Sequence, residues 1–499
     1  MYSEEQLRAI RHGDGPMLVL AGPGSGKTAV IAERVRYLTQ RLKVSDEQIL
    51  VITFTRAAAC EMQSRYQKIA GDSQVHFSTI HSLSFQILRQ SAAISPSQIV
   101  TESERLRMLS QVLLTFQLQH IFTVQDFSSM VSRYKCAGAD KADVIDAFTK
   151  TRLKEEFDLE ITELFDGYQR LLWMEDKLDL DDLSIAATRL LQNDPIAHAL
   201  WVKRYTYILI DEFQDVSNAQ FALMRLLIHP ARHNVFAVGD DDQSIYSFRG
   251  ADPTVMHMFL NVFPKAQRIT LGRNYRCGSE IVQKSSKLIA HNRSRFAKHL
   301  VSHAAVHANV SVICCETPRQ EALYIVESLQ SIPTDDTKPS AAILTRNRAS
   351  LRLYESALRQ AGIGPQRVAL ATFHGAKGLE FDTVYLPELI EGICPWMNGI
   401  QIENLEEERR ILYVAMTRAK SSLHILFPKE YRTKNTHPSR FLREMGVDQR
   451  HIVDYMSSSS TSSSNSCSSS HSSKASSTSS ASPSSTILSR TGSSFSSSE

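Results

Sequence analysis

Short, uninterrupted apolar runs recur along the chain and alternate with stretches of helical periodicity. A first series of runs lies at residues 17–21, 49–54, 207–210, 235–239 and 268–272. A second series lies at 310–315, 341–345, 368–373, 383–387 and 423–427. Apolar runs of about five residues are typical of strands buried on both faces, as in a parallel sheet covered by helices. Two such series predict an α/β fold with two parallel-sheet domains.

The region between the strands predicted at 49–54 and 207–210 has a different pattern. Residues 86–200 lack apolar runs of this kind and show helical periodicity instead. The helical patterns are LTFQLQHIF (114–122), LFDGYQRLLWM (164–174) and LSIAATRLL (183–191). We therefore expect an all-α insertion within the first domain.

The end of the chain has a composition of its own. Residues 457–499 contain 26 serines in 43 positions and very few apolar residues. Such a segment cannot bury enough apolar surface to offset the entropy lost on ordering. We expect a disordered Ser-rich tail at 456–499 and a folded part that ends near Tyr455.

The overall composition is ordinary for a soluble globular protein, with 42% hydrophobic and 22% charged residues. No run of about 18 apolar residues occurs, so we expect no transmembrane helix. The first residues, MYSEEQLRAIRHGDG, lack a signal-peptide pattern, so we expect a cytoplasmic protein that is not secreted. The net charge of +3 neither indicates nor excludes nucleic-acid binding, because a local groove can be basic in a balanced chain.

The seven cysteines show no metal-binding spacing, and we interpret them as free thiols of a reducing compartment. Cys314 and Cys315 are neighbours within the apolar stretch SVICCE. That setting favours a buried strand over redox chemistry for this pair.

A glycine-rich loop follows the strand predicted at 17–21 and precedes the helical stretch TAVIAERVRYL. We interpret it as a P-loop of the GxxxxGK[ST] type, whose backbone N–H groups and helix N-terminus bind phosphate oxygens. In this interpretation Lys27 reaches the β- and γ-phosphates and the Thr28 hydroxyl binds Mg²⁺. The loop consists of Gly22, Pro23, Gly24, Ser25, Gly26, Lys27 and Thr28.

An acidic pair follows the strand predicted at 207–210, in the sequence YILIDEFQD. Beside a P-loop, Asp211 is expected to hold Mg²⁺ and Glu212 to orient and deprotonate the attacking water. Without the P-loop, a solvated acidic turn would be the simpler interpretation. Together the two motifs predict that the chain binds and hydrolyses a nucleoside triphosphate.

The surrounding segments, in their order along the chain, resemble the motifs of the UvrD/Rep/PcrA-like superfamily 1A DNA helicases. The resemblance runs from about residue 3 to residue 427. Its segments are SEEQLRAI, VITFTRAAACEM, FSTIHSLSF, AVGDDDQSIYSFRGAD, LGRNYRCGSEIV, TFHGAKGLEFDTVYLP and EEERRILYVAMTRAKSSLHI.

The resemblance implies two RecA-like P-loop motor domains in tandem, with an all-α insertion in the first. The first domain (1A) is expected at 1–87 and 198–268, with the helical insertion (1B) at 88–197. The second domain (2A) is expected at 269–455. Family members commonly carry a further subdomain, 2B, between the motifs around Ile281 and Thr372. Only about 90 residues separate these two positions here, so we expect that 2B is missing.

The resemblance also implies roles for residues around ATP. Gln6 would read adenine, Tyr275 would stack on the base and Glu380 would lie near the ribose. Gln243 would sense the γ-phosphate. Arg276 and Arg418 from the second domain would neutralise transition-state charge, so the site would be complete only when the domains close.

For single-stranded DNA the resemblance implies a row of aromatic and polar contacts, since aromatic faces stack on any base. Phe248 stands where the family usually has tryptophan. Lys377 is also expected near DNA. The expected DNA-binding residues are Phe54, Thr55, His81, Tyr246, Phe248, Arg249 and His374.

The sequence therefore predicts an ATP- and Mg²⁺-dependent 3′→5′ DNA translocase and helicase acting on single strands and on single-strand/double-strand junctions. Because 2B is expected to be missing, one alternative is an ATP-gated clamp or protein-displacing translocase that does not unwind duplexes. A degenerate motor without catalysis is disfavoured, because Lys27, Asp211, Glu212, Gln243, Arg276 and Arg418 are all present.

Overall fold

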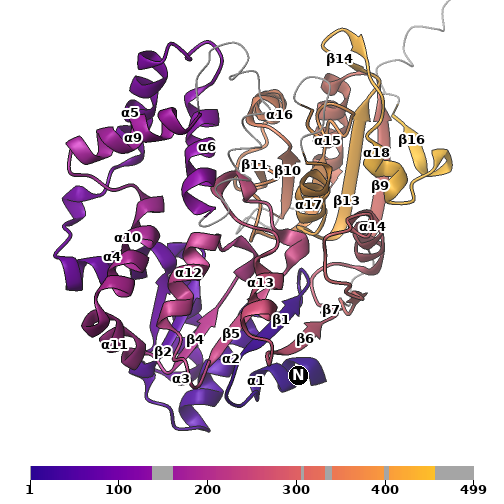
Figure 1. Cartoon of the computed structure of the whole chain (residues 1–499). Helices are drawn as coiled ribbons and strands as arrows, with labels where there is room; N and C mark the ends of the chain where they lie inside the picture. The colour runs from indigo at the N-terminus through magenta and orange to yellow at the C-terminus, as the bar shows by residue number, and fades with distance from the viewer. Residues whose placement is uncertain (1, 138–160, 305–307, 332–339, 398–403, 456–499) are drawn as a thin grey trace, which may run out of the picture. The chain divides into compact units, whose positions relative to one another are not determined.

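The computed structural model describes residues 2–137, 161–304, 308–331, 340–397 and 404–455. The expected tail at 456–499 lies outside the described residues. Two six-stranded sheets, both fully parallel, organise the described chain (Figure 1). This confirms the predicted α/β fold with two parallel-sheet units.

The first sheet has the strand order β3-β2-β4-β5-β1-β6. Its strands β1, β2, β4 and β5 are buried along their whole length, which explains their unbroken apolar sequences. The bounds are β1 (Met17–Ala21), β2 (Ile49–Thr53), β3 (His76–Thr79), β4 (Tyr207–Ile210), β5 (Val235–Gly239) and β6 (Gln267–Leu271).

The second sheet has the strand order β11-β10-β12-β13-β9-β16. Two small sheets accompany it, in which β7 (Arg273–Asn274) pairs with β8 (Val301–Ser302) and β14 (Glu430–Tyr431) pairs with β15 (Lys434–Asn435). The bounds of the main strands are β9 (Asn309–Cys315), β10 (Ala341–Thr345), β11 (Val368–Thr372), β12 (Phe381–Leu386), β13 (Ala419–Pro428) and β16 (Ile452–Asp454).

Several helices begin at well-formed caps, such as Thr101 and Asp179, whose side chains accept hydrogen bonds from the first turn. The helices before β7 are α1 (Glu4–Ile10), α2 (Lys27–Gln40), α3 (Arg56–Ala70), α4 (Ile80–Ala92), α5 (Glu102–Thr115), α6 (Val124–Cys136), α9 (Ile161–Met174), α10 (Leu180–Asn193), α11 (Pro195–Arg204), α12 (Asn218–Leu227) and α13 (Val255–Val262). The later helices are α14 (Ser279–Ile289), α15 (Pro318–Ser331), α16 (Arg348–Gln360), α17 (Leu405–Met416) and α18 (Arg440–Glu444).

The helices between β3 and β4 pack in two groups. Helices α5, α6 and α9 enclose a small core of their own, whereas α10 packs on α4 and contributes to the core beside the first sheet. Figure 1 shows α5 and α9 side by side, apart from the pair formed by α4 and α10. Among the described residues, no helix has the length and apolar character needed to cross a membrane.

Every apolar run predicted as a strand forms one. Cys314 and Cys315 are buried at the end of β9, as the buried-strand interpretation predicted. The strands β3 and β16 were not predicted, because neither HFST nor IVD is an apolar run of the kind used as the signal. The helix predicted over LTFQLQHIF is wrong: α5 ends at Thr115, and Gln117 has a positive φ of 59° that leads into a turn. The boundary expected between 268 and 269 falls inside β6, which pairs with β1 in the first sheet.

Candidate functional site

The candidate site lies at the carboxyl ends of the first sheet's strands, where α/β proteins usually bind ligands. The loop after β1 has two glycines with positive φ, Gly24 (65°) and Gly26 (80°), and α2 begins directly at Lys27. The Ser25 hydroxyl donates to the carbonyl of Gly22 over 2.7 Å and closes the turn. One detail of the predicted motif is wrong: the first glycine of GxxxxGK[ST] is replaced by Ala21, which is fully buried at the end of β1.

Gly24 is required by close packing as well as by its backbone angle. A Cβ atom there would lie 2.6 Å from the Cβ of Arg276 and 2.6 Å from the Asn274 side-chain oxygen. The backbone N–H of Tyr275 donates to the Gly24 carbonyl over 2.8 Å. The phosphate loop is therefore in direct contact with the segment that carries Tyr275 and Arg276.

Gln6 occupies a different place from the one expected. Its Nε2 donates to the carbonyl of Ser25 over 2.9 Å, and its Oε1 accepts from the backbone N–H of Ser3 over 2.8 Å. The side chain is buried, and it supports the phosphate loop from behind. With both ends of its amide engaged, Gln6 is not among the residues that line the cavity described below.

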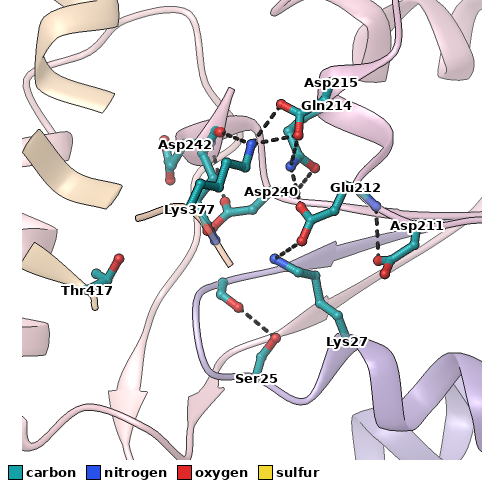
Figure 2. A network of polar contacts seen from close by, with 12 residues as sticks. Ser25, Lys27, Asp211, Glu212, Gln214, Asp215, Asp240, Asp242, Lys377 and Thr417 are labelled. Atoms are coloured by element: carbon teal, nitrogen blue, oxygen red, sulfur yellow. Dashed lines mark hydrogen bonds and ion pairs between the residues drawn. The ribbon is translucent and has the colours of Figure 1, made fainter. Parts of the chain in front are cut away.

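The acidic pair after β4 faces the loop. The Lys27 ammonium lies 3.7 Å from Glu212 Oε1, and the Asp211 carboxylate accepts from the Glu212 backbone N–H over 2.9 Å (Figure 2). Burial and the charge of Glu212 raise the pKa of Asp211 to about 7. Although burial opposes ionisation, Lys27 and Lys377 lower the pKa of Glu212 to about 2. Glu212 is thus held as an anion between two lysines.

Two functional residues in the same turn were missed from sequence. Gln214 is fully buried; it donates to Glu212 over 2.5 Å and accepts from the backbone N–H of Asp240 over 2.8 Å. A Cβ at Gly239 would lie 2.6 Å from the Gln214 side-chain oxygen, so glycine is needed there. The second missed residue, Asp215, accepts from Lys377. The acidic character of YILIDEFQD marked this segment, but only its first two carboxylates were interpreted.

Lys377 comes from the turn after β11 and reaches the first sheet. Its Nζ lies 2.8 and 2.6 Å from the two carboxylate oxygens of Asp215 and donates to the Gln243 carbonyl over 2.7 Å (Figure 2). Both side chains of this ion pair are buried. The expectation that Lys377 lies near DNA is therefore refined: its charge is used in a bridge between the two sheets' loops, and it also lies 4.8 Å from the Tyr246 ring centroid.

Gln243 and the predicted arginines, Arg276 and Arg418, lie near Lys27 and Glu212. The Gln243 Nε2 donates to Asp240 over 2.7 Å, and its Oε1 accepts from Arg418 over 3.3 Å. Burial and the neighbouring guanidinium of Arg276 lower the pKa of Arg418 to about 10, so Arg418 stays charged at neutral pH. Arg276 donates to Glu380 over 2.8 Å.

These groups line one cavity of about 930 Å³, which is large enough for a nucleotide. Most of the residues predicted from sequence to bind or hydrolyse ATP line it; Gly22 and Gln6 do not. The predicted residues in its lining are Gly24, Ser25, Gly26, Lys27, Thr28, Asp211, Glu212, Gln243, Tyr275, Arg276, Glu380 and Arg418.

A row of rings leads from this cavity toward the second sheet's loops. Phe54 and Tyr246, which also line the cavity, stack with centroids 5.1 Å apart and planes 12° apart. Tyr246 contacts Phe248 at 5.9 Å, and Phe248 contacts His374 edge-on at 5.5 Å. Arg249 lies 5.7 Å from the Tyr246 ring and 5.7 Å from the Phe248 ring. The structure therefore brings together five of the predicted DNA-binding residues.

The other two predicted DNA contacts are placed differently. Thr55 lines the cavity and caps α3, accepting from the Ala58 backbone N–H over 3.1 Å. His81 lies in the first turn of α4, 3.4 Å from Gln220, and burial lowers its pKa. His81 is not part of the ring row, and its contact with DNA stays a prediction.

The donor set suits a nucleoside triphosphate with a divalent cation. The Thr28 hydroxyl and the Asp211 carboxylate line the same cavity. Burial and the neighbouring Glu212 raise the pKa of Asp211, and hard oxygen ligands of this kind are what Mg²⁺ prefers. The residues present therefore fit Mg²⁺.

Comparison with known proteins gives the following matches. Residues 2–264 match the family model of the UvrD/REP helicase N-terminal domain, and residues 269–366 and 361–430 match that of the UvrD-like helicase C-terminal domain. The ATP-dependent DNA helicase PcrA of Staphylococcus epidermidis is 31% identical over 395 residues, which cover 77% of this chain and 53% of the relative. PcrA of Staphylococcus aureus is 30% identical over 390 residues, with the same coverage of 77% and 53%. The chain thus spans about half the length of these curated relatives.

Proposed function

The chain belongs to the UvrD/REP helicase family, and from this premise we propose that it is an ATP-dependent 3′→5′ single-stranded DNA translocase and helicase. One observation carries the proposal. The P-loop and residues from the loops of both sheets line one cavity, and Phe54 and Tyr246 belong both to this lining and to the ring row. A ligand in the cavity and a strand on the rings would therefore touch the same residues. The 3′→5′ polarity follows from the family premise.

In this proposal the cavity residues divide the work of ATP hydrolysis. Lys27 binds the β- and γ-phosphates, while Glu212 orients and deprotonates the attacking water. Gln243, Arg276 and Arg418 stabilise the charge that develops on the γ-phosphate. Thr28 and Asp211 would hold Mg²⁺, which neutralises phosphate charge when bound. Tyr275, which is 41% exposed at the cavity, stacks on the base.

The ring row supplies the proposed DNA track. Phe54, Tyr246 and Phe248 stack on bases without reading their sequence, and Arg249 attracts the phosphate backbone. Burial and the charges of Arg346 and Lys377 lower the pKa of His374 to about 4, so His374 is neutral at pH 7 and contributes a ring rather than a charge. Lys377 links this track to the cavity, because it contacts both the Tyr246 ring and Asp215.

We further propose the domain division 1–87 with 198–268, 88–197 and 269–455, in which a 2B subdomain is missing. The two segments that match the C-terminal family model meet at 361–366, in the turn between α16 and β11. The loss of 2B motivates the alternative, an ATP-gated clamp or protein-displacing translocase that does not unwind duplexes.

Strand displacement separates these alternatives. Two duplexes that carry a 3′ or a 5′ single-stranded tail are incubated with ATP and Mg²⁺, and the released strand is measured, with Lys27→Ala as the inactive control. Release from the 3′-tailed duplex alone is the expected result. ATP hydrolysis stimulated by DNA without release would establish the non-unwinding translocase. Release from the 5′-tailed duplex alone would contradict the proposed polarity.

A further inference from the structure

A buried cluster of charges lies beside the cavity, at the end of β5. It contains the consecutive carboxylates of Asp240, Asp241 and Asp242, together with the cations of Lys298 and Arg295. The Lys298 Nζ lies 2.7 Å from Asp240 and 2.8 Å from Asp242, and it also donates to Asp241. Arg295 binds Asp242 in a bidentate manner, over 2.8 and 2.6 Å.

The three carboxylates need a cation because they are buried and their negative charges lie close together. One oxygen from each lies within 4.8 Å of the others, an arrangement that could also hold a metal ion. The Lys298 side chain is 0% exposed and fills this position with its own ammonium group. Although burial opposes its charge, the three aspartates raise the pKa of Lys298, so the lysine is a permanent cation.

Lys298 is brought to the cluster by the segment 292–300, which follows α14 and which we call the strap. The strap's Phe296 joins the core beside the first sheet, where its ring stacks on His257 at 4.1 Å. The Phe296 backbone N–H donates to Asp241 over 2.7 Å. At the end of the strap, Leu300 lies against Gly22, where an added Cβ would come within 2.6 Å of it. The strap is thus anchored on both sides of Lys298.

A short chain of hydrogen bonds connects Lys298 to the cavity. Asp240 accepts from Lys298 through Oδ1 and from the Gln243 Nε2 through Oδ2, each over 2.7 Å. Because the Gln243 Nε2 is held in this way, its Oε1 faces Arg418. Gln243 lines the cavity, whereas Lys298 does not. The direct hydrogen-bonded route from Lys298 to the cavity therefore runs through Asp240 and Gln243.

We infer that Lys298 is a positioning residue for ATP hydrolysis: its ammonium fixes Asp240, which sets the orientation of the Gln243 amide toward Arg418 and the γ-phosphate. This assignment rests on the proposed function. Removing the ammonium leaves three crowded carboxylates, and Asp240 no longer has a fixed position from which to hold Gln243. Supporting residues of this kind typically contribute about 10- to 100-fold to activity.

The test is a double-mutant cycle with Lys298→Met and Gln243→Ala, read as DNA-stimulated kcat and as KM for ATP. Lys298→Met is expected to lower kcat by about 10- to 100-fold while KM changes by less than about threefold. In the Gln243→Ala background the same change is expected to lower kcat by less than about twofold, because the group that Lys298 positions is already gone.

The matched control is Lys135→Met, which removes another buried lysine that is paired with two aspartates, Asp179 and Asp182, at 2.9 Å each, away from the cavity. This variant is expected to lower thermal stability without lowering kcat of the folded protein. An equal loss of kcat from Lys298→Met in both backgrounds would overturn the inference, as would an equal loss from Lys135→Met. Where Lys298→Met does not fold, Lys298→Gln, which also removes the charge but keeps a hydrogen-bond donor, takes its place and the same outcomes decide. A wild type without ATP hydrolysis would overturn the proposed function and this assignment with it, whereas an active wild type with an additive cycle overturns the assignment alone.

Discussion

Two glutamates, the half-buried Glu212 and the fully buried Glu321, show opposite ways of placing a carboxyl group in this protein. Glu212, at the edge of the first sheet, lies 3.7 Å from Lys27, and Lys27 and Lys377 lower its pKa to about 2. Glu321, in α15 beside the second sheet, accepts from the Tyr354 hydroxyl over 2.9 Å and from the Glu388 backbone N–H over 3.1 Å. Burial and the neighbouring Glu388 raise the pKa of Glu321 to about 8.

The difference lies in what compensates the burial. At the first sheet's edge, Lys27 and Lys377 keep the Glu212 carboxylate charged. Lys377 also pairs with Asp215, although burial still raises the pKa of Asp215 to about 6. Beside the second sheet, a proton and neutral hydrogen-bond donors compensate the burial of Glu321, which is kept neutral. A buried carboxylate without a cation protonates, whereas one with a cation stays available for chemistry. The comparison therefore assigns the reactive carboxylates to the first sheet and a structural role to the Glu321–Glu388 pair.

Removing a lysine that compensates a buried carboxylate is expected to have the largest effect on the free energy of unfolding. Lys377→Met leaves Asp215 buried without its cation, and loss of one partner of a buried pair costs about 3–5 kcal/mol. Chemical unfolding should show this loss, and Asp215→Asn in the same chain should restore part of it. The control Lys429→Met removes an exposed pair with Glu316 and should change stability by less than about 1 kcal/mol. Equal losses in the two variants would contradict the comparison.

Removing the other lysine tests the charge that faces the phosphates. Lys27→Ala should lower the ATP turnover rate by at least about 100-fold, because a preorganised cation is lost from the transition state. Steady-state hydrolysis in the presence of single-stranded DNA measures the effect. Turnover retained within about tenfold would show that the phosphate site is wrongly assigned.

The ring row offers a change that leaves the carboxylates alone. Tyr246→Ala removes a ring that stacks on Phe54, and base stacking is worth about 1–3 kcal/mol. Binding of a labelled oligonucleotide should weaken by about 5- to 150-fold. Tyr246→Phe keeps the ring and should bind as the wild type does. Unchanged affinity in Tyr246→Ala would remove the row from the proposed DNA track.

The proton-held side of the comparison is expected to show itself only as a dependence of stability on pH. Because the pKa of Glu321 is raised to about 8, its folded form keeps a proton that the unfolded chain loses from about pH 4.5 upward. Stability from this group is therefore complete at low pH and is lost as the pH rises toward 8. The slope approaches about 1.4 kcal/mol per pH unit.

Glu321→Gln should flatten this dependence and leave the variant more stable than the wild type at pH 8. The exposed Glu355→Gln on α16 is the control and should leave the slope unchanged. The free energy of unfolding measured between pH 5 and pH 8 decides. A wild-type slope that Glu321→Gln does not alter would contradict the proton-held interpretation.

Sequence patterns predicted the sheets, the phosphate loop and the acidic pair because these have local signals, whereas Gln243, Tyr275, Arg276, Glu380 and Arg418 were expected only from the family resemblance. Unbroken apolar runs mark strands buried on both faces, and the glycines and Lys-Thr of the loop at 22–28 indicate a phosphate-binding turn before a helix. Contacts between distant segments have no such signal. The ion pair of Lys377 with Asp215 joins residues 162 positions apart in the sequence. Gln214 likewise packs against Gly239, which is not its neighbour in the sequence.

The same limit explains why the sequence did not reveal the partners of Gln6 and Lys298 or the end of α5. Gln6 matches the expected motif, but its position is set by Ser25 and Ser3, so its amide is used within the protein. The pattern LTFQLQHIF has enough apolar residues for a helix, yet the turn at Gln117 ends α5. Lys298 lies within NRSRFAKHL, whose short spacing gives no hint of the three aspartates it meets.

The central claim is that the cavity hydrolyses ATP with Glu212 as its base and that DNA on the ring row stimulates this reaction. Steady-state ATP hydrolysis with and without single-stranded DNA, for the wild type and Glu212→Gln side by side, tests it most directly. Strong stimulation in the wild type and a loss of about 10²- to 10⁴-fold in Glu212→Gln are the predicted results. A wild-type rate that DNA does not change, or a variant as active as the wild type, would contradict the account.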